Sequence, residues 1–257
     1  MTPRPESALL PQQKQVSEAV ILMAGSGSRL RGAHNTFLKP LVPILGRPLI
    51  SYTVDALLRA GIKKINAVVG FEGERLSTAV MRLIPSGIEF CAIKNPEWQK
   101  LNGISLLAAK DRVAAPFLLT MSDHLFDDVI IDLLLNSPDR GLLNVAVDRK
   151  LDSIFDLDDA MKLQTREDRV VAIGKNLRAY DAIDTGLFIC PLEIFEYFER
   201  ARQHDDCSLA DGVRLMAEEK RVRAVDIGDA WWQDVDTPEM LQRAEEVVLK
   251  RTKSTVR

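Results

Sequence analysis

A glycine-rich segment, AGSGSRL at 24–30, directly follows the short apolar run AVILM at 19–23. In open α/β sheets, ligands bind beyond the carboxyl ends of the strands, and glycine allows backbone N–H groups to come close to an anion. Arg29 lies within this segment and Lys39 follows it, so mobile positive charge is available beside the glycines. The pattern predicts a cradle for phosphate, although a glycine-rich loop by itself is also compatible with a tight turn.

The spacing of the glycines excludes two common phosphate-binding loops. The dinucleotide-binding fingerprint requires a third glycine three residues after the second, and Leu30 stands there. It also requires an acidic residue at the end of the second strand, where this chain has Gly70 and Phe71. A P-loop needs Lys-Ser or Lys-Thr after its last glycine, and the segment has neither.

Three aspartates stand where a metal ion could join bound phosphates. Asp123 comes just after the apolar run FLLTM at 117–121, and Asp234 and Asp236 come just before a predicted helix. Magnesium prefers one or two carboxylates together with phosphate oxygens and water. The alternative role is local, because Asp123 could cap a turn and Asp236 could cap the helix. His124 could contact a substrate phosphate or simply pack inside the fold.

Polar side chains around Gly103 are candidates for recognition of a base. Asn95, Asn102 and Ser105 flank this glycine, and amide and hydroxyl groups can hydrogen-bond the edge of a pyrimidine. The alternative is that Asn102 only caps the helix predicted at 103–110.

Strand-like and helix-like segments alternate in the first half of the chain and would position these residues. Five short runs rich in branched residues are flanked by turn formers, as strands covered on both faces should be: 19–23, 64–69, 88–93, 117–121 and 142–147. Apolar residues recur at helical spacing in 47–61, 103–110 and 127–136. Such alternation implies parallel pairing with right-handed crossovers.

The second half of the chain has a different pattern. Residues 160–175 alternate in polarity across a polar turn, which predicts a hairpin. We also expect strands at 183–190 and 221–227, and helices at 191–202, 208–219 and 238–251. The pattern predicts a single α/β domain, with a mostly parallel central sheet flanked by helices and a smaller antiparallel insertion on the substrate side. Its expected limits are 18–249, after a flexible arm at 1–17 and before a basic polar tail at 250–257.

Composition and charge narrow the classes of function. The 257 residues are 46% apolar and 28% charged, which suits a protein with a substantial core. The formal net charge of -3, without a basic stripe interleaved with aromatics, argues against nucleic acid as a partner. No segment approaches the roughly 18 consecutive apolar residues expected of a membrane span. The three cysteines are far apart, which indicates reduced thiols in a cytoplasmic protein.

The order of the motifs resembles a known family. The chain has G-x-G-x-R, then KPL, then GRPLI at the start of a helix. This order resembles that of the nucleotidyltransferases that join a nucleoside triphosphate to a phosphorylated sugar or alcohol and release pyrophosphate. The resemblance implies a Rossmann-like nucleotidyltransferase fold and a divalent ion, Mg²⁺ or Mn²⁺, held by Asp123 and Asp236, with Asp234 as the second choice for the latter position. It implies that the nucleotide contacts Met23, Ala24, Gly25, Ser26, Gly27, Arg29, Lys39, Asn95, Asn102, Gly103 and Ser105.

Further motifs narrow this resemblance. MSDH, IGK followed by YDAIDTGLFIC, CSLADGVRLMAE and DVDTPE occur in the same order in the CTP:inositol-1-phosphate cytidylyltransferases. That family implies the reaction of CTP with inositol 1-phosphate to give CDP-inositol, with Arg29, Lys39 and Lys175 as catalytic cations. It implies that the acceptor contacts His124, Lys175, Asp184, Thr185 and Gly186. Lys175 reaches the site only if the predicted hairpin folds over it, and is otherwise a surface lysine.

Other functions remain open at this point. Within the class, the acceptor could be phosphocholine, aminoethylphosphonate or a sugar 1-phosphate, and a cationic amine would require aromatic or acidic groups around it. Trp231 and Trp232 lie near the second metal-binding segment. From a different class, the chain could be a nucleotide-sensing regulatory subunit without catalysis, although such a subunit need not retain both the aspartates and the cations.

The resemblance also sets expectations about partners. In many relatives the domain is fused to a membrane-embedded transferase, so we expect either a stand-alone enzyme or a part that works with a membrane CDP-alcohol phosphotransferase. The expected substrates are CTP and a phosphorylated polyol, and a homodimer is left open.

Overall fold

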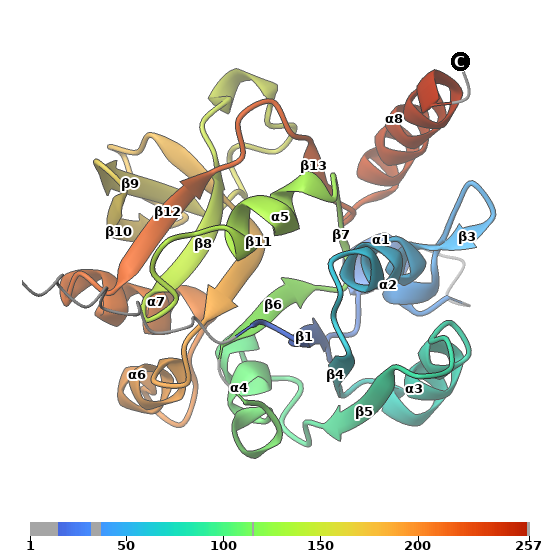
Figure 1. Ribbon diagram of the computed structural model, residues 1–257, viewed down its shortest axis with the longest axis horizontal. Coiled ribbons are helices and arrows are strands. Elements are labelled where there is room, and N and C mark those ends of the chain that lie inside the picture. Colours follow the sequence, from blue (N-terminus) through green and yellow to red (C-terminus); the bar gives the residue numbers. More distant parts are fainter. Residues whose placement is uncertain (1–14, 32–36, 115, 256–257) are drawn as a thin grey trace, which may run out of the picture.

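A nine-stranded sheet forms the centre of the molecule (Figure 1). The computed structural model describes residues 15–31, 37–114 and 116–255. The strands of the sheet lie in the order β5-β4-β1-β6-β11-β8-β12-β10-β9. Their bounds are β1 (Glu18–Met23), β4 (Lys64–Val69), β5 (Glu89–Lys94), β6 (Phe117–Met121), β8 (Leu143–Asp148), β9 (Lys162–Arg166), β10 (Arg169–Gly174), β11 (Ala182–Cys190) and β12 (Val222–Asp226).

Most strands of this sheet run in one direction. Parallel pairing joins β5, β4, β1 and β6, and also joins β8 to β12. Antiparallel pairing joins β11 to β6, β8 and β9, and joins β10 to β9 and β12. Only β10 and β11 therefore oppose the rest of the sheet, which confirms the predicted, mostly parallel α/β architecture. The hairpin predicted at 160–175 is also found, as β9 and β10, and it extends the same sheet at one edge.

Helices cover both faces of the sheet. Along β1, Val20 and Leu22 pack into the core cluster that contains α4, α6 and α7, whereas Ala19 and Ile21 pack into the cluster that contains α2, α3 and α5. This two-sided burial is the reason that the strand is a continuous apolar run. The bounds are α1 (Ser28–Arg31), α2 (Leu49–Arg59), α3 (Gly73–Met81), α4 (Asn102–Leu107), α5 (Val129–Leu135), α6 (Ile194–Ala201), α7 (Leu209–Glu218) and α8 (Pro238–Thr255), with 3₁₀ turns η1 (Lys39–Leu41), η2 (Lys110–Arg112) and η3 (Leu151–Ser153).

Helix α3 is the main element that the sequence pattern does not predict. Only Leu76 and Val80 of its nine residues are buried, so its apolar periodicity is weak. Tertiary packing against β4 and β5 stabilises it, as is usual for short helices.

Two short strand pairs lie outside the central sheet: β2 (Pro43–Ile44) with β3 (Arg47–Pro48), and β7 (His124–Phe126) with β13 (Trp232–Asp234). The second pair brings together segments that are distant in sequence, with His124 opposite Asp234. A third core cluster packs α8 against this pair through Leu125, Val235 and Ala244. The carboxyl ends of β1 and β6 and the end of β13 thus meet at one edge of the molecule.

The two ends of the chain differ from expectation in one respect. Helix α8 continues to Thr255, beyond the end predicted at 251, so residues 250–255 of the predicted basic tail extend the helix, because lysine and arginine are good helix formers. Figure 1 shows α8 extending away from the sheet. The arm predicted at 1–17 lies outside the described residues except for 15–17, where Val16 is buried. Within the described ranges, none of the helices combines the length and the apolar character needed to cross a bilayer.

Candidate active site

The glycine-rich loop leaves β1 at the carboxyl edge of the sheet. Met23 and Ala24 are buried, and the Ala24 carbonyl accepts a hydrogen bond from the backbone N–H of Phe71 at 2.9 Å. Gly25 is exposed and Ser26 is half-buried beyond that anchor. A Cβ at Gly25 would meet no atom within 4 Å, so the backbone there is open to a ligand.

Lys39 is a buried cation between two carboxylates. It lies in η1, is 9% exposed, and its Nζ donates to Asp123 Oδ2 at 2.5 Å and to Asp236 Oδ1. Its aliphatic chain packs against Gly27, which has φ +62° and where a Cβ would lie 2.5 Å from Lys39 Cβ. Glycine is therefore required at 27. Burial disfavours the ammonium, but the charges of Asp123 and Asp236 outweigh burial and raise the pKa of Lys39.

Asp123 and His124 form a second pair beside this lysine. Asp123 Oδ1 lies 2.7 Å from His124 Nδ1, and the imidazole stacks on Trp232 with 5.8 Å between ring centroids. Burial opposes ionisation of Asp123, but Lys39 and His124 hold its pKa well below the usual range. Burial likewise opposes protonation of His124, but Asp123 raises the pKa of the imidazole. His124 thus both packs in the fold and borders the site.

Asp236 completes the charge cluster. Its Oδ2 accepts a hydrogen bond from Arg29 Nη2 at 2.6 Å, while its Oδ1 accepts from Lys39. All four carboxylate oxygens of Asp123 and Asp236 are therefore paired. Asp234 does not share Lys39 with Asp123; it borders the cavity described below, where burial raises its pKa.

Asp123 and Asp236 converge closely enough to serve one metal ion. Both contact the same Nζ of Lys39, so their oxygens face one point. Among the described residues no group of three or more His, Cys, Asp or Glu side chains could hold a metal ion. Two carboxylates, with phosphate oxygens and water completing the coordination, are what Mg²⁺ accepts. The donor set fits such an ion if Lys39 moves onto a phosphate when the nucleotide binds.

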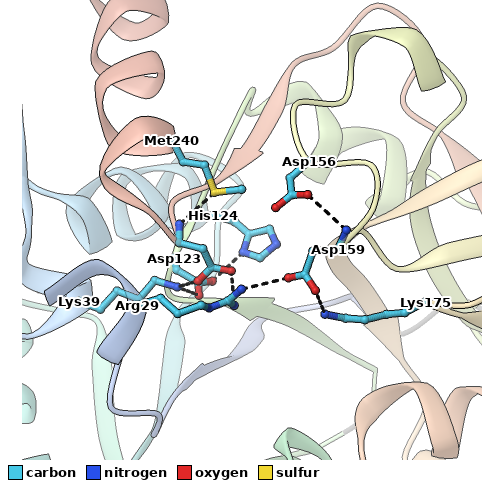
Figure 2. Close-up of polar contacts among 9 residues, drawn as sticks. Arg29, Lys39, Asp123, His124, Asp156, Asp159, Lys175 and Met240 are labelled. Carbon is cyan, nitrogen blue, oxygen red and sulfur yellow. Dashed lines mark hydrogen bonds and ion pairs between the residues drawn. The ribbon is translucent and has the colours of Figure 1, made fainter. Parts of the chain in front are cut away.

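The charged side chains continue from this cluster toward the hairpin. Lys175 follows β10 and its Nζ donates to Asp159 Oδ1, and Asp159 Oδ2 accepts from Arg29 Nη1 at 3.0 Å. Figure 2 shows these groups as one row from Lys39 to Lys175. The hairpin therefore folds over the site, as a role for Lys175 requires. Sequence reasoning missed Asp159, because the acidic run DLDD at 156–159 is indistinguishable by composition from a solvated turn.

The predicted acceptor motif in β11 is divided between two faces. Asp184 borders the cavity, its Oδ1 accepts from the Gly186 N–H at 2.8 Å, and burial raises its pKa to about 6. Gly186 has φ +76°, and a Cβ there would lie 2.8 Å from His124 Nε2. Thr185 faces the other side, because side chains alternate along a strand. It is fully buried and its Oγ1 donates to the Ala146 carbonyl at 2.9 Å, away from the cavity.

The residues predicted to read a base hold helices together. Asn95 Nδ2 donates to Ser105 Oγ at 3.0 Å, and both side chains are buried. A Cβ at Gly103 would lie 2.6 Å from the Cys207 carbonyl, so Gly103 allows α4 to approach the start of α7. Asn102 begins α4 and does not cap it; its Oδ1 accepts from the N–H of Leu209, the first residue of α7. Only Asn102 of this group reaches the cavity.

A cavity of 450 Å³ lies along the row of charges from Arg29 to Lys175, and this size suits a small-molecule ligand. Its walls include Arg29, His124, Lys175, Asp184, Asp234 and Asp236. Four phenylalanine and tryptophan rings also line it, and a cation or an imidazole covers a face of three of them. The pairs are Arg243 over Phe155 at 4.9 Å, Arg251 over Trp231 at 5.2 Å and His124 on Trp232 at 5.8 Å.

Comparison with known proteins identifies the family. The model of the MobA-like NTP transferase domain matches residues 19–152, from β1 to η3. That range is about half of the chain and includes Arg29, Lys39 and Asp123. The chain belongs to the MobA-like NTP transferase family. The resemblance to nucleotidyltransferases found in the sequence motifs is thus confirmed.

Relatives of this MobA-like domain include two-function proteins. The "Bifunctional IPC transferase and DIPP synthase" of Aquifex aeolicus is 31% identical over 236 residues, which are 91% of this chain and 52% of the relative. The protein of the same name from Thermococcus kodakarensis is 35% identical over 235 residues, 90% of this chain and 50% of the relative. The chain spans about half the length of these curated relatives.

Solved structures of nucleotidyltransferases have the same fold. The inositol-1-phosphate CTP transferase from T. maritima superposes with a TM-score of 0.80 at 25% identity, covering 91% of this chain and 98% of that chain. A UDP-glucose pyrophosphorylase complexed with UDP-glucose has a TM-score of 0.77 at 18% identity and covers 92% of this chain, which shows the shared fold alone. The predicted nucleotidyltransferase fold is confirmed by both.

Proposed function

We propose that the chain joins CTP and inositol 1-phosphate to give CDP-inositol and pyrophosphate. The observation that carries the proposal is that one cavity is lined both by Arg29 with Asp236 and by Lys175 with Asp184. Such a cavity can hold a triphosphate and a phosphorylated acceptor side by side. The identity of the two substrates is supported by the name of the T. maritima enzyme, which is similar over nearly its whole length.

The chemistry proposed is a direct transfer between the two substrates. An oxygen of the acceptor's phosphate attacks the α-phosphorus of CTP, and a new P–O bond forms. The bond from the α-phosphorus to the oxygen that bridges to the β-phosphorus breaks, and its electron pair leaves with pyrophosphate. Because the attacking phosphate is already ionised, no side chain has to remove a proton. Catalysis then depends on positioning and on stabilisation of charge.

The cations of the site have distinct roles in this scheme. Arg29 and Lys39 bind phosphates of the nucleotide beside the exposed backbone of Gly25, and Lys175 binds the acceptor's phosphate. Mg²⁺ or Mn²⁺ held by Asp123 and Asp236 would neutralise charge on the triphosphate.

The lining of the cavity favours a polyol over a cationic amine as the acceptor. Seven aspartates line it, and carboxylates accept hydrogen bonds from hydroxyl groups. A quaternary ammonium group would need open aromatic faces. Arg243, Arg251 and His124 each cover a face of one ring, and the fourth ring, Phe188, is only 2% exposed. The guanidinium groups beside Phe155 and Trp231 would also repel a cation.

Recognition of cytosine is assigned to Asn102. Its carbonyl oxygen is used by the N–H of Leu209, whereas its amide nitrogen makes no hydrogen bond within the described part of the chain and can donate to a pyrimidine. Asn95 and Ser105 bond to each other and support α4 from behind.

Release of pyrophosphate, measured over a panel of nucleoside triphosphates and phosphorylated acceptors, tests the proposal. We expect turnover with CTP and inositol 1-phosphate, and little with UTP or with phosphocholine. Turnover only with another nucleotide and acceptor would refute the named substrates, but the chain would still be a nucleotidyltransferase. If no combination of nucleotide and acceptor releases pyrophosphate, the proposal that the chain catalyses nucleotidyl transfer is refuted.

We also propose that this chain is a cytoplasmic enzyme. Its product then passes to a membrane-embedded CDP-alcohol phosphotransferase. The proposal is supported by the bifunctional names of the curated relatives, of which the chain spans about half. Adding membranes that contain such a transferase should consume CDP-inositol made by the purified chain. A homodimer stays a prediction, which light scattering can check.

A further inference from the structure

Asp159 joins the two cations that face each other across the cavity. Its Oδ2 accepts from Arg29 Nη1 at 3.0 Å, and its Oδ1 accepts from Lys175 Nζ. Arg29 comes from α1 after the glycine-rich loop, whereas Lys175 comes from the end of the hairpin, so one carboxylate links two distant segments. Figure 2 shows Asp159 between Arg29 and Lys175.

The backbone holds Asp159 in this place by contacts that do not involve its own charge. Lys162 is 7% exposed, and its Nζ donates to the Asp158 carbonyl at 3.2 Å and to the Lys175 carbonyl at 2.9 Å. This buried ammonium ties the loop before β9 to the segment after β10. Asp156 Oδ1 also accepts from the Asp159 N–H at 3.3 Å. The approach of Asp159 to Lys175 is therefore built into the fold, unlike a chance surface pair.

The geometry of the carboxylate resembles that of a bound phosphate monoester. Two oxygens that share negative charge bridge a guanidinium and an ammonium, and both cations bind phosphate in the same way. Arg29 uses its other nitrogen, Nη2, on Asp236, so Nη1 is the end that faces Lys175. A phosphate between these two cations would lie next to the pair of carboxylates that we assign to the metal ion.

We propose that the Asp159 carboxylate occupies the position of the acceptor's phosphate and leaves it when the acceptor binds. The inference rests on the proposed function, because it takes Lys175 as the ligand of the attacking phosphate. It adds that Arg29 contacts the same phosphate and so touches both substrates. Asp159 is then a positioning residue, which keeps Arg29 and Lys175 facing each other until the phosphate replaces it.

Exchange of this kind is easy because the pairs are exposed. The side chains of Arg29, Lys175 and Asp159 are 60%, 49% and 42% exposed, so water screens their attraction. A phosphate dianion carries more charge than a carboxylate and can displace it. Rotation of the Asp159 side chain is sufficient, since Lys162 holds the backbone through carbonyl groups alone.

Replacing Asp159 by asparagine tests the inference, because the amide keeps the shape and loses the charge. We expect the KM for inositol 1-phosphate to fall about three- to tenfold while kcat changes less than about twofold, since the competing anion is removed. A merely structural role would instead raise KM or lower kcat. Asp158→Asn is the matched control: it makes the same charge change one residue away, and the exposed Asp158 side chain has no hydrogen bond or ion pair within the described residues.

Calorimetry with inorganic phosphate separates this inference from the proposed substrates. Asp159→Asn should bind phosphate about three- to tenfold more tightly than the unmodified chain, Asp158→Asn should bind it equally, and Lys175→Ala should bind it more weakly. An unchanged or weaker affinity in Asp159→Asn, an equal gain in Asp158→Asn, or no phosphate binding in any variant would overturn the inference. Failure of turnover with CTP and inositol 1-phosphate, with the phosphate affinities as expected, would overturn only the named substrates.

Discussion

The two ends of the row of charges from Lys39 to Lys175 are held in different ways. At the nucleotide end, Lys39 is buried and every oxygen of Asp123 and Asp236 is paired. At the acceptor end, Lys175 and Asp159 are roughly half exposed, and Asp184 has only the Gly186 N–H as a hydrogen-bond donor within the described residues. The first arrangement is rigid until a bound phosphate becomes the new partner of Lys39, because removing one member leaves a buried charge without its partner. The second can exchange partners, as a site that admits and releases an acceptor must.

The largest expected effect is at the nucleotide end. Asp123→Asn should lower kcat about 10²- to 10³-fold, because it removes a proposed metal ligand and a partner of Lys39. Pyrophosphate release measures the loss, and far-UV circular dichroism should show an unchanged fold. Asp128→Asn is the control, since Asp128 pairs with Arg59 at the exposed surface. Equal activity of the two variants would remove Asp123 from the site.

A second change tests whether the nucleotide end is rigid. Gly27→Ala should lower kcat about 10- to 100-fold and destabilise the fold by about 1–3 kcal/mol, because a Cβ would strike the Lys39 side chain at a positive φ. Gly25→Ala should unfold at the same urea concentration as the unmodified chain, since a Cβ there meets no atom within 4 Å. If both variants behave alike in urea unfolding and in turnover, the loop is more adaptable than the structure indicates.

At the acceptor end we expect a change in affinity. Lys175→Ala should raise the KM for the acceptor about 10- to 100-fold, through loss of a charge-assisted hydrogen bond, and leave the KM for CTP within about twofold. Steady-state kinetics with each substrate varied in turn measures both constants. A larger increase in the KM for CTP than in the KM for the acceptor would show that Lys175 binds the nucleotide instead of the acceptor.

At Asp184 we expect an effect of pH on stability. Burial raises its pKa to about 6, so the folded state holds this proton more tightly than the unfolded chain does. The resulting stabilisation is present at low pH and is lost as pH rises through about 6. Asparagine does not titrate, so between about pH 4.5 and 7.5 Asp184→Asn should gain about 2 kcal/mol in the free energy of unfolding relative to the unmodified chain. Urea unfolding measures the difference, and a difference independent of pH would contradict the burial of this carboxyl.

Much of the framework follows from the sequence. Runs of branched residues predict β1, β4, β5, β6 and β8 to within about a residue, because strands covered on both faces must be apolar throughout. The pair β7 and β13 is not predicted, since each strand has only three residues and its partner lies far along the chain. That pair nevertheless sets Asp234 opposite His124, and it ends just before Asp236.

The candidate residues divide in the same way. Arg29, Lys39, Asp123 and Asp236 can be selected from the sequence, because charged residues just beyond apolar strands and glycines form a recognisable pattern, and the structure brings all four together. Their mutual pairing could not be predicted, and the three-dimensional fold alone turns Thr185 away from the cavity and Asn95 toward Ser105.

By itself, the sequence determined the fold class, the family motifs and the chemical types available to the site. The tertiary structure decided which of those groups meet. Asp159 is the clearest case: nothing in the local run DLDD distinguishes it from Asp158, yet one carboxylate bridges Arg29 and Lys175 and the other is exposed to solvent. The physical reason is that local sequence sets backbone preference and burial, whereas contacts between distant segments depend on how the hairpin packs over the end of the sheet.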